Sequence, residues 1–184
     1  MKKLAARIVL FIVGWKVENL DLDIAEKSMH IAFPHSSTRD IFIGMSYIFL
    51  KQIEVMLFVS HKSFYWPFEK FMLNNGCIKV DRSLRDGLTE KLAREFENNR
   101  IFRLLIMPEA TRRKKNGIRT GFWYIAHKAS IPVYCWLLDH KKKSLRCIGR
   151  IDKLTSLDND LAILYELYRD EGYLIPLANK FTAG

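Results

Sequence analysis

The sequence has few cysteines and no histidines at the spacing of metal ligands. Its three cysteines, Cys77, Cys135 and Cys147, are odd in number and widely separated, without a CxxC pair. This argues against a disulfide scaffold or a zinc knuckle and fits a reducing compartment. Cys77 and Cys135 lie in apolar runs and are expected in the core. We therefore predict no metal site.

A long hydrophobic run is also missing. After Met1-Lys2-Lys3, about twelve mainly apolar residues lead to Trp15, whereas a helix needs about 20 to cross a bilayer. No small-x-small cleavage site follows, which argues against a signal peptide. Two alternatives remain for residues 1–15: a short helix lying in the membrane interface, or a helix packed on the core of the domain. Residues 16–184 are predicted to form a single domain.

The charge is strongly positive. The 184 residues include 30 lysines and arginines against 20 acidic residues, a formal charge of +10. Such an excess favours nucleic acid, acidic lipid, phosphorylated substrates or an acidic carrier protein as partners, and a merely solvated basic surface is equally compatible with it. With 49% hydrophobic residues, the chain is expected to fold around a substantial core.

Strand and helix patterns alternate along the chain. We predict strands at residues 29–33, 55–60, 77–80, 101–107, 131–138 and 144–151. Helices are predicted at residues 40–53, 64–74, 86–98, 121–129 and 157–169. This alternation predicts an α/β fold with a mostly parallel central sheet flanked by helices. Ligands of such folds bind where strands end.

The most informative polar residues follow the first predicted strand. Because His35 and Asp40 flank a short loop before a helix, the carboxylate can meet one ring nitrogen of His35 and leave the other nitrogen to act as a base. Taken alone, this pair is weak evidence for catalysis. Ser36, Ser37 and Thr38 are expected to cap the helix rather than to act as nucleophiles.

Three further short segments also follow or begin predicted strands. They comprise residues 76–82, residues 107–112 with the basic run to Lys115, and residues 131–133. The first of these segments contains Arg82, and the second contains Arg112 at the start of its basic run. A guanidinium group can donate two parallel hydrogen bonds to a phosphate. A histidine base near arginines suits transfer onto a phosphorylated alcohol.

The four blocks resemble the four motifs of the glycerolipid acyltransferases, typified by 1-acyl-glycerol-3-phosphate acyltransferase. Residues 35–40 match H-x4-D, and residues 76–82 resemble G-x-I-x-x-x-R. Residues 108–112 resemble P-E-G-T-R, with Ala110 where the family usually has glycine, and residues 131–133 resemble the closing I-P-V block. The resemblance follows the family's order over about residues 29–138. Residues 120–126 are similar to a compact bacterial branch.

This resemblance implies an acyltransferase of phospholipid biosynthesis with a glycerol-phosphate acyltransferase-like αβ sandwich. A fatty acyl group would pass from acyl-CoA or acyl carrier protein to the hydroxyl of a lysophospholipid, with 1-acyl-glycerol-3-phosphate as the first expectation. His35 would be the general base and Asp40 would orient it. The expected acceptor-binding residues are Lys79, Arg82, Glu109, Thr111 and Arg112. No cofactor besides the acyl donor is expected.

The implied location is the cytoplasmic face of a membrane, as a peripheral or monotopic protein on an anionic surface. A non-catalytic nucleic-acid-binding protein is the alternative from another class, because the charge and the 12% aromatic residues permit it. No recognised nucleic-acid motif occurs, so no nucleic acid partner is expected. A peripheral membrane protein that kept the fold but lost catalysis is the other alternative, because Ala110 departs from the motif.

Overall fold

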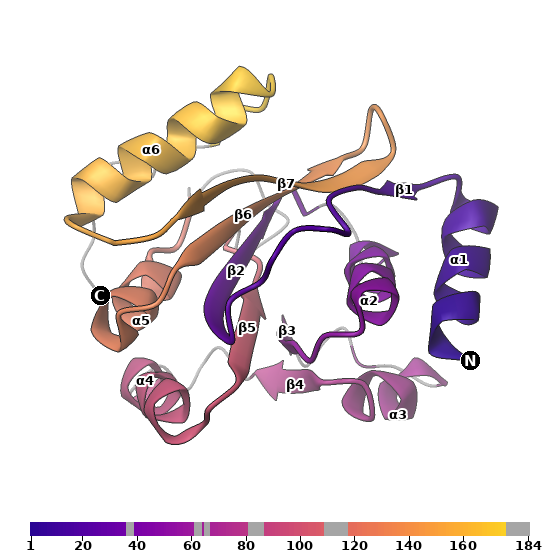
Figure 1. Ribbon diagram of the computed structural model, residues 1–184, viewed down its shortest axis with the longest axis horizontal. Coiled ribbons are helices and arrows are strands. Elements are labelled where there is room, and N and C mark those ends of the chain that lie inside the picture. The colour runs from indigo at the N-terminus through magenta and orange to yellow at the C-terminus, as the bar shows by residue number, and fades with distance from the viewer. Residues whose placement is uncertain (36–38, 61–63, 65–66, 81–86, 109–117, 176–184) are drawn as a thin grey trace.

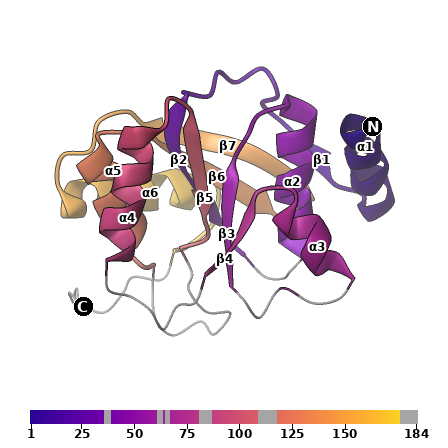
Figure 2. The same cartoon turned by 90° about the horizontal axis from the view of Figure 1, so that it is seen from below.

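A seven-stranded sheet lies between helices on both of its faces (Figures 1 and 2), which confirms the predicted α/β class. The computed structural model describes residues 1–35, 39–60, 64, 67–80, 87–108 and 118–175. The strands are β1 (Lys16–Val17), β2 (Lys27–Phe33), β3 (Met56–Ser60), β4 (Cys77–Val80), β5 (Phe102–Ile106), β6 (Val133–Asp139) and β7 (Ser144–Ile151). Only β1, two residues long, has no counterpart among the predicted strands.

The strand order is β1-β7-β6-β2-β5-β3-β4. Every pair is parallel except β6 and β7, which form the predicted hairpin. The path from β2 through β3 to β4 moves toward one edge of the sheet, and the path from β4 through β5 to β6 returns. Because such crossovers are right-handed, the connecting helices of the two paths lie on opposite faces.

The helices follow this rule. They are α1 (Lys2–Val13), α2 (Arg39–Lys51), α3 (Phe68–Leu73), α4 (Leu88–Asn98), α5 (Gly121–Ala129) and α6 (Leu157–Asp170). Figure 2 shows α1, α2 and α3 on one side of the sheet and α4, α5 and α6 on the other. The predicted helix at residues 64–74 was too long, since α3 begins only after Pro67. A proline disfavours helical geometry in the residue before it.

The core is divided by the sheet into layers, as the alternation of β6 shows. Val133, Cys135 and Leu137 pack into the cluster beneath α4, α5 and α6. Tyr134, Trp136 and Leu138 point to the opposite face and pack with residues of α1 and α2. The whole strand is buried, because both faces of a parallel sheet are covered by helices. Cys77 is also buried, as expected.

The N-terminal helix α1 lies on the outer flank of α2 (Figure 1). Its Ala6 and Leu10 are buried, while Leu4, Phe11 and Ile12 remain 64%, 87% and 74% exposed. Gly14, at φ 67°, ends the helix in the left-handed conformation that glycine adopts without a Cβ penalty. In the described part of the chain, no helix has the length and apolar character that a bilayer crossing needs.

Gly76, between α3 and β4, lies where a side chain would not fit. Gly76 has φ +85°, and a Cβ placed there would lie 2.9 Å from the carbonyl oxygen of Val55. We expect Gly76→Ala to lower the free energy of unfolding by about 1–2 kcal/mol or more, measured by urea denaturation. Gly121→Ala is the matched control. Its Cβ would meet nothing within 4 Å, so the change should be neutral or stabilising. Equal stability of the two variants would contradict this account.

Candidate active site

The site lies at the edge of the sheet where the parallel strands end. Strands β2, β3, β4, β5 and β6 run in the same direction, so their carboxyl ends share this edge. The connections leave β2 and β5 toward opposite faces, and the carboxyl ends of two such neighbouring strands border a crevice. His35 follows β2 at this position, and Met107 and Pro108 follow β5.

His35 and Asp40 are brought into contact by the junction of β2 and α2. Nδ1 of His35 lies 3.1 Å from Oδ2 of Asp40. The Asp40 side chain, in the first turn of α2, is 1% exposed, whereas that of His35 is 18% exposed. This geometry holds the imidazole through Nδ1 and assigns the proton-accepting role to Nε2. The sequence analysis anticipated the pair, and its catalytic role remains a prediction.

A second histidine reaches the same carboxylate. Nε2 of His140 lies 3.8 Å from Oδ1 of Asp40, and its side chain is 34% exposed. The ring of Trp15 meets that of His140 edge-on, with centroids 5.2 Å apart. Sequence analysis missed His140, although the position of the residue offered a signal. It directly follows β6, at the same edge of the sheet as His35.

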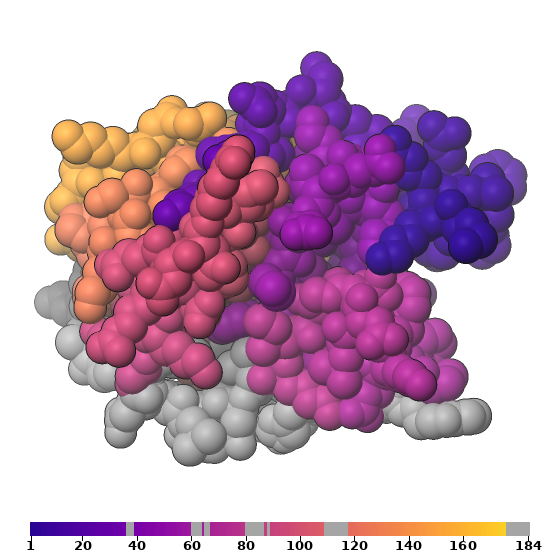
Figure 3. Space-filling view, turned by 60° about the horizontal axis from the view of Figure 1, so that its bottom comes forward, coloured from indigo at the N-terminus to yellow at the C-terminus, as the bar shows by residue number. Residues whose placement is uncertain are grey.

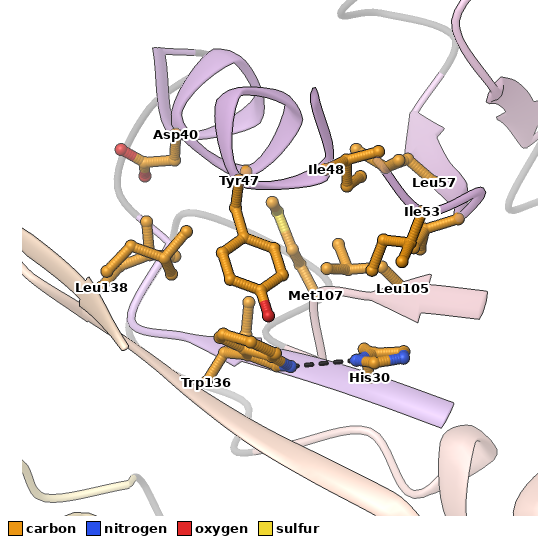
Figure 4. A pocket seen from close by; sticks show the side chains of 14 residues that line it. His30, Asp40, Tyr47, Ile48, Ile53, Leu57, Leu105, Met107, Trp136 and Leu138 are labelled. Carbon is orange, nitrogen blue, oxygen red and sulfur yellow. Dashed lines mark hydrogen bonds between the residues drawn. The ribbon is translucent and has the colours of Figure 1, made fainter. Parts of the chain in front are cut away.

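An apolar cavity extends from Asp40 between α2 and the sheet (Figure 4). The cavity is narrow, with a free volume of about 30 Å3, and it opens to solvent. In Figure 4, α2 contributes Asp40, Tyr47 and Ile48, and the strands contribute His30, Leu57, Leu105, Trp136 and Leu138. Almost all of the lining is hydrocarbon or aromatic. A cavity of this kind suits an apolar ligand whose polar end remains at Asp40 and His35.

His30, in the cavity wall, is a neutral core residue. Trp136 donates its indole N–H to Nδ1 of His30 over 3.0 Å, which leaves Nε2 to donate to the hydroxyl of Ser28 at 2.9 Å. The Ser28 hydroxyl in turn donates to the carbonyl of Ala25. Burial, together with the charge of Arg103, lowers the pKa of His30 to about 3. This environment indicates a structural role for His30.

The predicted acceptor-binding residues are only partly described. Lys79, on the edge strand β4, forms an ion pair with Glu69 of α3, and its ammonium group lies over the ring of Phe64. Arg82, Glu109, Thr111 and Arg112 are also predicted to bind the acceptor. These four residues, and Ala110, lie outside the described ranges.

The ends of the segment that carries three of these predicted residues are held together. The backbone N–H of Arg119 donates to the carbonyl of Pro108 over 3.0 Å. The chain therefore leaves β5 and returns to α5 at one point of the edge that also bears His35. The binding roles of the predicted residues stay predictions.

A comparison with protein families agrees with the fold. The family model described as acyltransferase matches residues 15–138, which is more than half of the 184-residue chain. The match includes β2, α2 and the strands up to β6. The chain belongs to the acyltransferase family, which includes the glycerolipid acyltransferases, and is an O-acyltransferase type of enzyme. Searches of curated proteins and of solved structures gave no match.

The low pKa of His30 makes stability depend on pH. His30 is neutral in the folded state down to about pH 3, whereas in the unfolded chain it takes up a proton below about pH 6.5. The contribution of neutral His30 to the free energy of unfolding is thus fully present above pH 6.5 and declines as the pH falls toward 3. Between pH 7 and pH 5, the protonation of His30 in the unfolded chain should lower the free energy of unfolding by about 2 kcal/mol.

Urea unfolding at the two pH values measures this loss. His30→Gln is the informative variant, because its amide can accept from Trp136 and donate to Ser28 without titrating. We expect the loss between pH 7 and pH 5 to be smaller in this variant than in the wild type. An equal loss in both proteins would show that His30 is not the group responsible.

Proposed function

We propose that this protein transfers a fatty acyl group from the thioester of acyl-CoA or acyl carrier protein to the hydroxyl of a lysophospholipid, with 1-acyl-glycerol-3-phosphate as the preferred acceptor. The observation that carries the proposal is the contact of His35 with Asp40 at the end of an apolar cavity. The apolar lining of the cavity suits the apolar part of the substrate, and the histidine suits the reacting hydroxyl.

In this scheme, Nε2 of His35 takes the proton of the acceptor hydroxyl while the oxygen attacks the thioester carbonyl. The tetrahedral intermediate collapses, the C–S bond breaks, and the imidazolium returns the proton to the departing thiolate. Asp40 keeps the imidazole oriented through Nδ1 and offsets the positive charge that develops on the ring. The buried position of Asp40 strengthens this interaction, because little water screens it.

The acceptor's phosphate is the second part of the proposal. Arg82 and Arg112 are proposed to bind it, with Lys79 as a helper and with Glu109 and Thr111 holding the acceptor. Support comes from the motifs that contain these residues and from the formal charge of +10. The same charge suits both proposed donors, since acyl-CoA and acyl carrier protein are both anionic.

The reaction is tested with isotope-labelled acyl-CoA and acyl carrier protein, each offered to a panel of lysophospholipids and analysed by mass spectrometry. His35→Ala should lower the transfer rate by about 10²–10⁴-fold, because a positioned general base contributes that factor. Asp40→Asn, which preserves shape but removes the charge, should lower kcat with a smaller change in KM.

His127→Gln is the matched control for these variants. His127 lies on α5, on the opposite side of the sheet, and stacks on Trp123. This variant should retain wild-type transfer. Folded His35→Ala protein with an undiminished rate would refute the proposed base. Salt-sensitive nucleic acid binding by a wild-type protein that transfers no acyl group would favour the non-catalytic alternative.

We further propose that α1 holds the enzyme on an anionic membrane surface, at the cytoplasmic face and without crossing the bilayer. Figure 3 shows α1, in indigo, at one end of the molecule. Its exposed apolar residues include Phe11 and Ile12, and Lys2, Lys3 and Arg7 lie on the same helix. An amphipathic helix with basic residues binds through buried apolar area and through attraction to anionic lipids.

Co-sedimentation with phosphatidylglycerol–phosphatidylcholine vesicles tests this role. Phe11→Ser combined with Ile12→Ser should weaken binding by at least about tenfold, because two large apolar side chains no longer enter the lipid. Ile163→Ser combined with Leu174→Ser is the matched control, since it removes two exposed apolar side chains from the region of α6. Equal binding of the two double variants would rule out the role of α1.

A further inference from the structure

Each oxygen of the Asp40 carboxylate faces a different histidine. Oδ2 lies 3.1 Å from Nδ1 of His35, and Oδ1 lies 3.8 Å from Nε2 of His140. The side chain of Asp40 is almost completely buried, so these imidazoles lie beside a carboxylate that water screens little. A positive charge on either ring therefore changes the electrostatic potential at the other ring.

The turn that carries His140 is fixed by a buried carboxylate, that of Asp139, through hydrogen bonds. Asp139, the last residue of β6, is 2% exposed and accepts hydrogen bonds from the backbone N–H groups of Lys141 and Lys142 at 3.1 and 2.8 Å. The hydroxyl of Tyr173 donates to the same oxygen over 2.8 Å. These bonds set the backbone that immediately follows β6, and with it the position of His140.

Further contacts restrict the His140 ring, and the basic residues near it have partners of their own. Trp15 packs edge-on against the His140 ring, and the backbone N–H of Trp15 donates to the carbonyl of Leu10. The lysines of the turn have their own neighbours: Lys141 lies over Tyr173, Lys142 approaches Asp139, and Lys143 approaches Gly14. Arg146 of β7 is paired with Glu171 through two hydrogen bonds of 2.6 Å.

Asp40, from α2, is an acidic group against His140, and the uncharged Trp15 faces its ring from the N-terminal segment. We propose that His140 is a positioning residue for the His35–Asp40 pair, which steadies the second oxygen of Asp40 and adjusts through its own charge how readily His35 takes up a proton. This inference rests on the proposed function for its catalytic meaning.

The charge effect has a definite sign. A cation at position 140 shares the attraction of Asp40 and repels a proton on His35, so His35 should titrate at lower pH. A neutral side chain there leaves the carboxylate to His35, which should titrate at higher pH. The titration midpoint of His35 should therefore be higher with glutamine at position 140 than with lysine there.

The experiment follows the ring nitrogens of His35 by 15N NMR as the pH is varied in the full chain. We expect the titration midpoint of His35 to be higher in His140→Gln than in His140→Lys by roughly half a pH unit or more. The acid limb of the pH–rate profile, measured with oleoyl-CoA and lysophosphatidic acid, should shift in the same order. A purely structural role would lower the rate without moving that limb.

His127→Gln and His127→Lys are the matched control pair, because they make the same charge change on the far side of the sheet. They should leave the His35 midpoint unchanged. If His35 titrates identically in the two position-140 variants, the inference about His140 is wrong. If the variants do not fold, the titration of the wild-type protein is the test. A His35 curve with one step, unaffected by the protonation of His140, would also show that the inference about His140 is wrong.

The two proposals fail in different ways. If wild-type protein transfers no acyl group, or if His35→Ala transfers as fast as the wild type, then the proposed function fails, while the NMR titration still decides the role of His140. If transfer requires His35 but the midpoints do not respond to position 140, then only the inference about His140 fails.

Discussion

Strand β2 is hydrogen-bonded on both sides to parallel strands, to β5 through residues 27–31 and to β6 through residues 29–33. This double pairing fixes the end of β2 beside the end of β5, and the connections that follow these two strands leave toward opposite faces of the sheet. Whatever follows β2 is therefore delivered to the crevice at the strand ends. His35 takes this position, and His140 follows the neighbouring strand β6, 105 residues later in the numbering. Distant parts of the sequence meet here because the strands are parallel.

The negative charge of Asp40 is buried at this point and must be compensated by its neighbours. An isolated buried charge is costly unless hydrogen-bonding or charged partners compensate for it. Asp40 lies in the first turn of α2, where the positive end of the helix dipole favours an anion. The histidines lie at its two oxygens. The surrounding cavity wall is apolar, so the favourable contacts of Asp40 are concentrated at the point where the chemistry is proposed.

The sequence predicted the fold class and most elements because helical and strand periodicities are local properties. It also predicted the His35–Asp40 contact, since the two residues flank one short loop. It missed β1, which has only two residues and acquires its identity by pairing with β7. It overextended α3, where Pro67 limits the start of the helix. The place of His140 depends on the order of strands in the sheet, which periodicity does not determine.

The cavity also bears on how transfer could prevail over hydrolysis. A histidine that accepts a proton from an alcohol can equally accept one from water, so the base itself does not choose between the two acceptors. In the proposed reaction, hydrocarbon would fill the space between α2 and the sheet, and water would then be displaced from the side of Asp40 that faces this cavity. Phosphate binding would bring the acceptor hydroxyl to His35. Selectivity for transfer would thus come from occupancy of the site, with the histidine supplying the same proton transfer in either case.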